Sequence, residues 1–207
     1  MLLAMEKAFH LLQRYGIAAP RYFMSKTISE AQLAAHNLQF PVVIKADSPD
    51  IIHKSDHGCV RIAYTEQMFD TAYKHVLKNA QKQTHHVRGV LVQEHVTGVE
   101  CIVGSALDSQ FGKTIMFGSG GVFIEALHDV SFRLVPITPN DAKSMIHDTV
   151  ISWFIESNRR PINHTALVDI LLRVSDMVQR ETIEELDINP LFVNEKGALA
   201  ADVRILV

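Results

Sequence analysis

Short apolar runs alternate with amphipathic segments along the chain, and this alternation constrains the fold more than any other feature. The runs at 41–46 and 89–94 are rich in valine, leucine and isoleucine, which is typical of buried strands. The segments at 27–37 and 65–81 each follow the pattern of a helix that begins at a capping threonine. Because strands and helices interleave throughout, the sequence predicts an α/β or α+β protein.

The second half of the chain continues this alternation. Segments 99–107 and 113–117 are predicted strands. Segment 134–137 is a further predicted strand, and its proline favours a position at a sheet edge. Thr138, followed by proline, is placed to begin a helix. Between the two halves, a domain boundary is expected near 94–98.

Charge and cysteine content exclude several classes of protein. Lys and Arg number 20 and Asp and Glu 23, a net charge of −3, whereas nucleic-acid binders usually carry a basic excess. No apolar run approaches the ~20 residues that span a bilayer. The two cysteines, Cys59 and Cys101, are too few for a disulfide scaffold or a four-ligand zinc site. We therefore expect a cytoplasmic protein that binds neither nucleic acid nor a membrane.

Lys45 stands near the end of the predicted strand at 41–46, where a charged side chain needs an explanation. Lysine rarely lies inside a core without a partner. Two interpretations stay open. Either Lys45 points to solvent from the strand end, or its ammonium group is directed at a phosphate.

The loop that follows, 48–58, combines groups that can bind or carry phosphate. His53 supplies an imidazole, and Lys54 and Ser55 supply a cation and a hydroxyl group. Backbone N–H groups in such a loop can also cradle an anion. The Walker A pattern is absent, and an ordinary polar loop is the alternative.

Two further segments carry candidate functional groups. A glycine-rich segment at 118–121, predicted to be a flexible turn, is followed by Glu125, Asp129 and Arg133, although an ordinary loop would look the same.

The other segment is a C-terminal hairpin predicted from 185–193 and 198–207. Asp187 and Asn189 are two residues apart and share one side of a strand, and Asp202 can reach that side from the other arm. Such oxygen ligands suit Mg²⁺, which takes one or two protein groups together with phosphates. The alternative is a solvated strand face.

In their order along the chain, these motifs resemble the ATP-grasp subunit or domain of the ADP-forming acyl-CoA synthetases, relatives of the succinyl-CoA synthetase β chain. Each motif alone is weak, but the ordered series is specific and covers nearly the whole sequence. The motifs are PVVIK ending at Lys45, SPDIIHKSD around His53, VLVQEHV around Glu94, GVECIVG around Glu100, FGSGGVFIE ending at Glu125, DVSFR ending at Arg133, ELDINPL around Asn189, and the pair ending at Asp202.

The resemblance implies an ATP-grasp fold, in which a nucleotide lies between two lobes. The lobes would be 21–96 and 97–207, the second ending in the Mg²⁺-binding hairpin, and 1–20 would form an N-terminal helix and linker. By the same resemblance, Lys45 reaches phosphate and adenine. Glu94, His95 and Val96, with the preceding glutamine, form the hinge that hydrogen-bonds adenine, and Glu100 lies near the ribose hydroxyls.

The resemblance also implies a reaction, acyl-CoA + ADP + phosphate ⇌ acid + CoA + ATP. Asn189 and Asp202 match the Mg²⁺ ligands, with Asp187 close by. His53 matches a histidine that relays the phosphoryl group, and Arg133 would add positive charge. Acyl-CoA and phosphate would enter through a CoA-binding α subunit or a fused CoA-binding domain, which carries the first phosphohistidine.

Two departures from the family pattern affect this interpretation. The family usually has Gly-Gly-Val where this chain has Gly58, Cys59 and Val60, and it usually has a Gly-x-Arg-Gly turn before the last long helix where this chain has Ser-Asn-Arg-Arg-Pro at 157–161. The altered glycine positions slightly favour an alternative function, a non-catalytic ATP-grasp regulatory domain of a protein lysine acyltransferase. Intact His53, Asn189 and Asp202 favour the enzyme.

Overall fold

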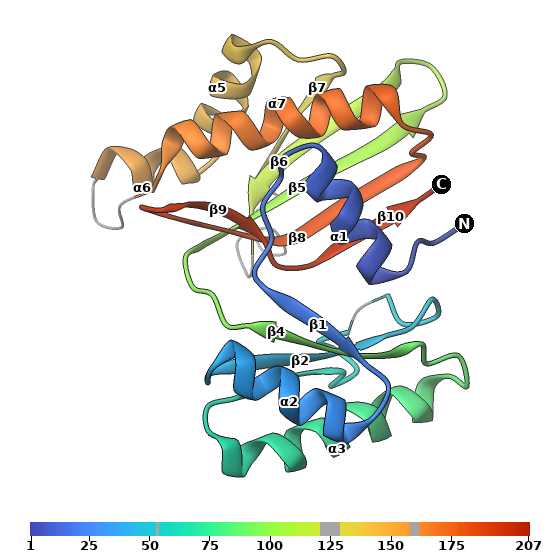
Figure 1. Cartoon of the computed structure of the whole chain (residues 1–207). Helices are drawn as coiled ribbons and strands as arrows, with labels where there is room; N and C mark the ends of the chain where they lie inside the picture. The colour runs from blue at the N-terminus through green and yellow to red at the C-terminus, as the bar shows by residue number, and fades with distance from the viewer. Residues whose placement is uncertain (53, 121–128, 158–161) are drawn as a thin grey trace. The chain divides into compact units, whose positions relative to one another are not determined.

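The computed structural model describes residues 1–52, 54–120, 129–157 and 162–207, and these residues form two compact units. The smaller unit is Pro20–Val96, and the larger unit joins Met1–Ala19 to Thr97–Val207. Each unit contains its own antiparallel sheet (Figure 1). The mixed α/β architecture predicted from the sequence is confirmed. None of the described helices is long and apolar enough to cross a membrane.

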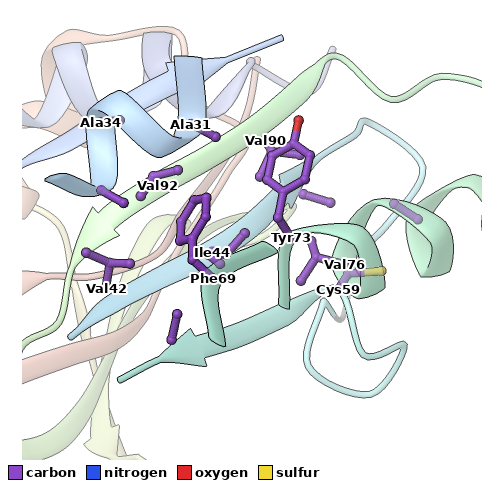
Figure 2. Packing of buried hydrophobic residues seen from close by; sticks show 14 of the residues in the cluster. Ala31, Ala34, Val42, Ile44, Cys59, Phe69, Tyr73, Val76, Val90 and Val92 are labelled. Atoms are coloured by element: carbon purple, nitrogen blue, oxygen red, sulfur yellow. The ribbon is translucent and has the colours of Figure 1, made fainter. Parts of the chain in front are cut away.

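The smaller unit is a four-stranded sheet with two helices on one face. Val42 and Ile44 of the second strand pack against Phe69 and Tyr73 of the longer helix (Figure 2). Burying one large apolar side chain in this way contributes ~1.5–3 kcal/mol. The strand order is β1-β4-β2-β3, and the elements are β1 (Tyr22–Ser25), α2 (Ile28–Leu38), β2 (Val42–Asp47), β3 (Val60–Ala63), α3 (Glu66–Gln83) and β4 (Gly89–Glu94).

The larger unit is a six-stranded sheet with α7 lying across it (Figure 1). Lys113, near the start of β6 (Gly112–Ser119), donates hydrogen bonds to the backbone carbonyls of Val178 and Glu181 at the end of α7 (His164–Arg180). These bonds join the helix to the sheet. The order is β10-β8-β5-β6-β7, with β9 paired to β8. The elements are α1 (Met5–Arg14), β5 (Val99–Asp108), β6 (Gly112–Ser119), β7 (Val130–Leu134), α5 (Pro139–His147), α6 (Ile151–Ser157), α7 (His164–Arg180), β8 (Glu185–Asn194), β9 (Gly197–Ala200) and β10 (Val203–Leu206).

The predicted capping residues begin their helices. Thr27 Oγ1 accepts a hydrogen bond from Glu30 N at 3.2 Å at the start of α2. At α5, Thr138 Oγ1 accepts from Asp141 N, and the Asp141 carboxylate accepts from Thr138 N at 2.8 Å. This second bond favours the charged carboxylate and lowers the pKa of Asp141.

The strand predicted at 134–137 is wrong in its extent. The strand β7 ends at Leu134, although it does lie at the edge of the sheet, as predicted. Val135 N still donates to Lys113 O at 2.9 Å, but Pro136 has no N–H to continue the ladder. Ile137 N instead donates to Ser175 Oγ of α7 at 3.0 Å. The chain therefore leaves the sheet at the proline and turns toward the helix.

Side chains of the larger sheet alternate between a face covered by α5 and α7 and the opposite face, which we call the open face. Ile188 of β8 and its partner Val103 of β5 lie on the helix-covered face and are fully buried. Residues one position along each strand therefore point to the open face. Asp187 of β8 and Gly104 of β5 are such a pair.

Candidate functional site

Lys45 lies on β2, on the face of the smaller sheet opposite α2 and α3. Its cross-strand neighbours are Val60 on β3 and Leu91 on β4. Only 5% of Lys45 is exposed, as for Asp47 two residues further along the same face. The interpretation of Lys45 as a solvent-exposed strand end is therefore wrong. A buried ammonium group attracts an anion more strongly than one in water, because the local dielectric constant is lower.

The predicted adenine hinge follows β4. The Glu94 carboxylate accepts a hydrogen bond from Arg21 Nε at 3.1 Å, and Glu94 N donates to Arg21 O at 2.8 Å. His95 N donates to Pro41 O at 3.4 Å. Arg21 therefore engages the Glu94 side chain, and the N–H groups of Glu94 and His95 are both hydrogen-bonded within the smaller unit.

The loop at 48–58 is described only in part, because His53 lies outside the described residues. The departure at Cys59 has a clear structural outcome. The Cys59 side chain is fully buried and belongs to the core cluster that includes Val76 and Ala80 of α3 (Figure 2). Burial raises the pKa of its thiol. The thiol therefore fills the core on the helix side and is not displayed on the surface of the loop.

The C-terminal hairpin brings Asn189 and Asp202 together. Asn189 N donates to Asp202 O at 3.2 Å, and Ala201 N donates to Pro190 O at 3.0 Å. The second arm is interrupted here, between β9 and β10, and is not the continuous strand predicted at 198–207. On the other edge of β8, the register against β5 shifts between Cys101 and Val103, which marks a β-bulge or irregularity.

Asp187 lies on the same strand as Asn189, on the open face. Its partner on β10 is Arg204, and its partner on β5 is Gly104. Glu100 lies on the same face of β5 as Gly104, since the two are four positions apart along the strand, and it is exposed. The open face therefore gathers Asp187, Arg204 and Glu100.

The donor set around Asn189 and Asp202 fits a hard cation. Both side chains offer oxygen atoms, and Asp202 Oδ1 also accepts a hydrogen bond from Val203 N at 2.9 Å. The described residues contain no group of three or more His, Cys, Asp and Glu side chains that could hold a metal ion. A metal ion here would therefore rely on few protein ligands, as Mg²⁺ does when phosphate and water complete its shell.

Arg204 is a candidate residue that the motifs did not reveal. Its Nη1 lies 3.3 Å from Glu185 Oε1, while its Nε is buried and has no hydrogen-bond partner among the described residues. A buried donor without an acceptor costs ~1–3 kcal/mol, so this atom is suited to an acceptor from a ligand. One feature of the sequence could have identified Arg204. It lies two positions after Asp202, and in an extended segment residues two positions apart point to the same side.

Arg133 is not brought together with these residues. It pairs with Ile115 of β6, whose side chain is fully buried on the helix-covered face. Its Nη2 donates to Ser144 Oγ and to Asp148 Oδ2, both at 2.7 Å. The arrangement serves to join β7 to α5, and the catalytic role of Arg133 stays a prediction.

The glycine-rich segment is a strand in its first part, not a flexible turn, because β6 continues through Gly118 and Ser119. Gly120 N donates to Glu100 O at 2.8 Å. A Cβ atom on Gly120 would lie 2.9 Å from Glu100 Cβ and 3.0 Å from its carbonyl carbon. Glycine is thus required here by close approach to β5, beside Glu100. Glu125 lies outside the described residues.

Known proteins match the chain over its full length. A family model described as an ATP-grasp domain matches residues 1–207. The ADP-forming acetate–CoA ligase II of Archaeoglobus fulgidus is 40% identical over 100% of this chain but only 30% of the relative. The β subunit of the ADP-forming acetate–CoA ligase I of Pyrococcus furiosus is 38% identical, over 97% of this chain and 90% of the subunit. This chain therefore spans about 30% of the length of the first relative.

A solved structure is similar as well. It is acetyl-coenzyme A synthetase 1 of Ca. Korarchaeum cryptofilum with coenzyme A and Mg-AMPPCP, its phosphohistidine segment pointing towards the nucleotide binding site. Its TM-score is 0.82 at 33% identity, over 100% of this chain and 92% of that chain.

The close approach of Gly120 to Glu100 predicts the effect of a single methyl group. Gly120→Ala should destabilise the larger unit by ~1–3 kcal/mol in urea unfolding, because the methyl group meets backbone that cannot move away. Gly104→Ala is the matched control on the same sheet, since its Cβ would meet the flexible end of Met116 at 3.1 Å. Equal stability of the two variants would contradict this account.

Proposed function

Because this chain belongs to the ATP-grasp domain family, we propose that it is the nucleotide-binding, phosphoryl-transferring component of an ADP-forming acyl-CoA synthetase. The proposed overall reaction is acyl-CoA + ADP + phosphate ⇌ acid + CoA + ATP, in the cytoplasm. The observation that carries the proposal is the apposition of Asn189 and Asp202, with Arg204 two residues further on, whose Nε has no hydrogen-bond partner in the part of the chain that the structure describes. Oxygen ligands beside a guanidinium group are suited to a metal–phosphate complex.

In the smaller unit, the proposed roles concern the nucleotide. Lys45 would bind a phosphate group. It is buried, and in a medium of low dielectric constant its positive charge attracts an anion more strongly than it would in water. The backbone from Glu94 through His95 to Val96 would hydrogen-bond adenine. Support for this role comes from the Arg21–Glu94 ion pair at 3.1 Å, which holds the start of the segment in place.

In the larger unit, the proposed roles concern the metal and the ribose. Asn189 and Asp202 would bind Mg²⁺, with Asp187 nearby, and Glu100 would accept hydrogen bonds from the ribose hydroxyls. When bound, Mg²⁺ neutralises phosphate charge during phosphoryl transfer. Arg204 would offset part of the negative charge of the neighbouring acids and offer its Nε to a phosphate oxygen. Phosphoryl transfer depends mainly on such positioning and neutralisation.

The proposed partner is a CoA-binding α subunit or a fused CoA-binding domain, through which acyl-CoA and phosphate enter. His53 would accept the phosphoryl group from that partner and pass it to ADP. A neutral imidazole is available near pH 7 for this step. Part of the argument for a purely regulatory domain rested on Cys59 in place of a glycine. That part loses its force because the thiol lies in the core. The other altered glycine positions fall at 158–161, outside the described residues.

Replacing Lys45 tests nucleotide binding. Lys45→Ala should weaken Mg-ADP binding at least about tenfold in calorimetry, because one charge-assisted contact of ~1.5–3 kcal/mol is lost. Lys74→Ala, which removes an exposed lysine of α3, should leave the affinity unchanged. Folded wild-type protein that gives no nucleotide signal together with its partner would refute nucleotide binding.

Replacing Asp202 tests the metal site. Asp202→Ala should make nucleotide affinity insensitive to Mg²⁺, with circular dichroism unchanged, because a charged oxygen ligand is lost. Asp169→Ala, at an exposed position of α7, is the matched control. The ligand assignment fails if wild-type affinity is the same in Mg²⁺ and in EDTA.

Replacing His53 tests the relay. The wild-type chain, mixed with its CoA-binding partner, acyl-CoA and phosphate, should gain an acid-labile, base-stable phosphoryl group on His53. His53→Ala should retain nucleotide binding but lose ATP formation, whereas His57→Ala should retain both. Full ATP formation by His53→Ala would show that the phosphoryl group reaches ADP by another route.

A further inference from the structure

A tight turn at residues 54–59 directly follows His53 in the sequence. Cys59 N donates to Lys54 O at 2.7 Å, and Gly58 N donates to Ser55 O at 2.9 Å. Gly58 has a φ of +64°. This is the Schellman pattern, in which a left-handed glycine ends one turn of helix. The turn therefore has a defined conformation of its own.

Asn79 of α3 packs directly against this turn. Its Nδ2 donates to Gly58 O at 3.2 Å. A Cβ atom on Gly58 would lie 2.6 Å from the same Nδ2. Glycine at position 58 is thus favoured by its backbone angle, and any side chain there would also displace the Asn79 amide.

Asn79 is itself oriented by two further residues. Its Nδ2 lies 2.9 Å from His75 Nε2, and Arg61 Nη2 lies 3.1 Å from the same ring nitrogen. Guanidinium and amide nitrogens can only donate, so His75 Nε2 accepts, and the ring carries its proton on Nδ1. Both hydrogens of the Asn79 amide are then used, one toward His75 and one toward Gly58.

Asp50 and Ile51, which precede the turn in the sequence, are also held in place. Ile51 is 3% exposed and packs in the helix-side core. The Asp50 carboxylate accepts hydrogen bonds from Thr84 Oγ1 and from His86 Nδ1, the latter at 3.0 Å. These bonds, first from Thr84 and then from His86, lower the pKa of Asp50. Both Asp50 and Ile51 and the turn at 54–59 are therefore fixed by contacts within the smaller unit.

We propose that Asn79, oriented by His75 and Arg61, is a positioning residue for phosphoryl transfer. It fixes the turn at 54–59 and thereby limits the conformations of the residues that would hold the phosphoryl group, including Lys54 and Ser55. The inference rests on the proposed function of His53. Ordering these groups before the reaction reduces the entropy lost on reaching the transition state.

Cys59 provides a built-in reporter of this turn. Its thiol is fully buried and its N–H closes the turn, so opening of the turn should increase the access of an alkylating reagent to it. Cys101 is equally buried, in the larger unit, and serves as an internal reference. In the full-length protein, with any partner subunit, peptide-resolved mass spectrometry can follow iodoacetamide labelling at both sites.

The expected result is faster labelling at Cys59 alone. Asn79→Ala should label Cys59 at least about fivefold faster than wild type, as expected when one hydrogen bond is lost, with Cys101 unchanged. Asn79→Asp should have an equal or larger effect, because an acceptor would then face Gly58 O. Gln81→Ala, at an exposed position of the same helix, is the matched control.

The functional readout is a split between kcat and KM. In ATP formation with the partner, Asn79→Ala should lower kcat at least about fivefold and leave KM for ADP unchanged, because Asn79 acts on the turn and not on the nucleotide. Unchanged labelling of Cys59 in both variants would overturn the anchoring. Faster labelling with unchanged kcat would overturn the positioning role. Absence of His53 phosphorylation in wild type would refute the proposed function, while the labelling result would still decide the anchoring.

Discussion

Strand β8 is hydrogen-bonded along both of its edges, and the larger unit depends on this pairing. One edge carries β5, and the other carries β10 and then β9. The ladder is interrupted at Asn189, where the bulge against β5 and the break beside Asp202 coincide. At this break the backbone of Asn189 pairs with that of Asp202, because Asn189 N donates to Asp202 O. Two residues with oxygen-bearing side chains therefore lie opposite each other in the hairpin.

Both sheets separate an apolar, helix-covered face from a face that carries charge. In the smaller unit, Ile44 packs in the core while Lys45, the next residue, lies on the opposite face. In the larger unit, Ile188 and Asp187 are divided in the same way. Since side chains alternate along a strand, the core that stabilises each sheet also fixes where its charged residues lie. Stability and the candidate site are therefore determined by the same hydrogen-bond register.

Local rules account for what the sequence predicted well. A capping threonine accepts a hydrogen bond from the backbone N–H three residues further on, so Thr27 and Thr138 identify the starts of α2 and α5. The alternation of side chains along a strand likewise predicted that Asp187 and Asn189 lie on the same side of one arm of the hairpin. The end of β7 was predicted less well, because Ile137 leaves the sheet for a hydroxyl group of α7, 38 residues further along the chain.

The sequence by itself determined the α/β class, the helix starts and the identity of the motifs, because these depend on residue type and short spacing. Only the tertiary structure decided that Lys45 is buried, that Cys59 fills the core and that Arg133 joins β7 to α5 on the helix-covered face. It also joined Met1–Ala19 to the larger unit, across 77 intervening residues (Pro20–Val96). Burial, and the partner that a charged group finds, depend on residues distant in sequence, and chain folding alone brings these together.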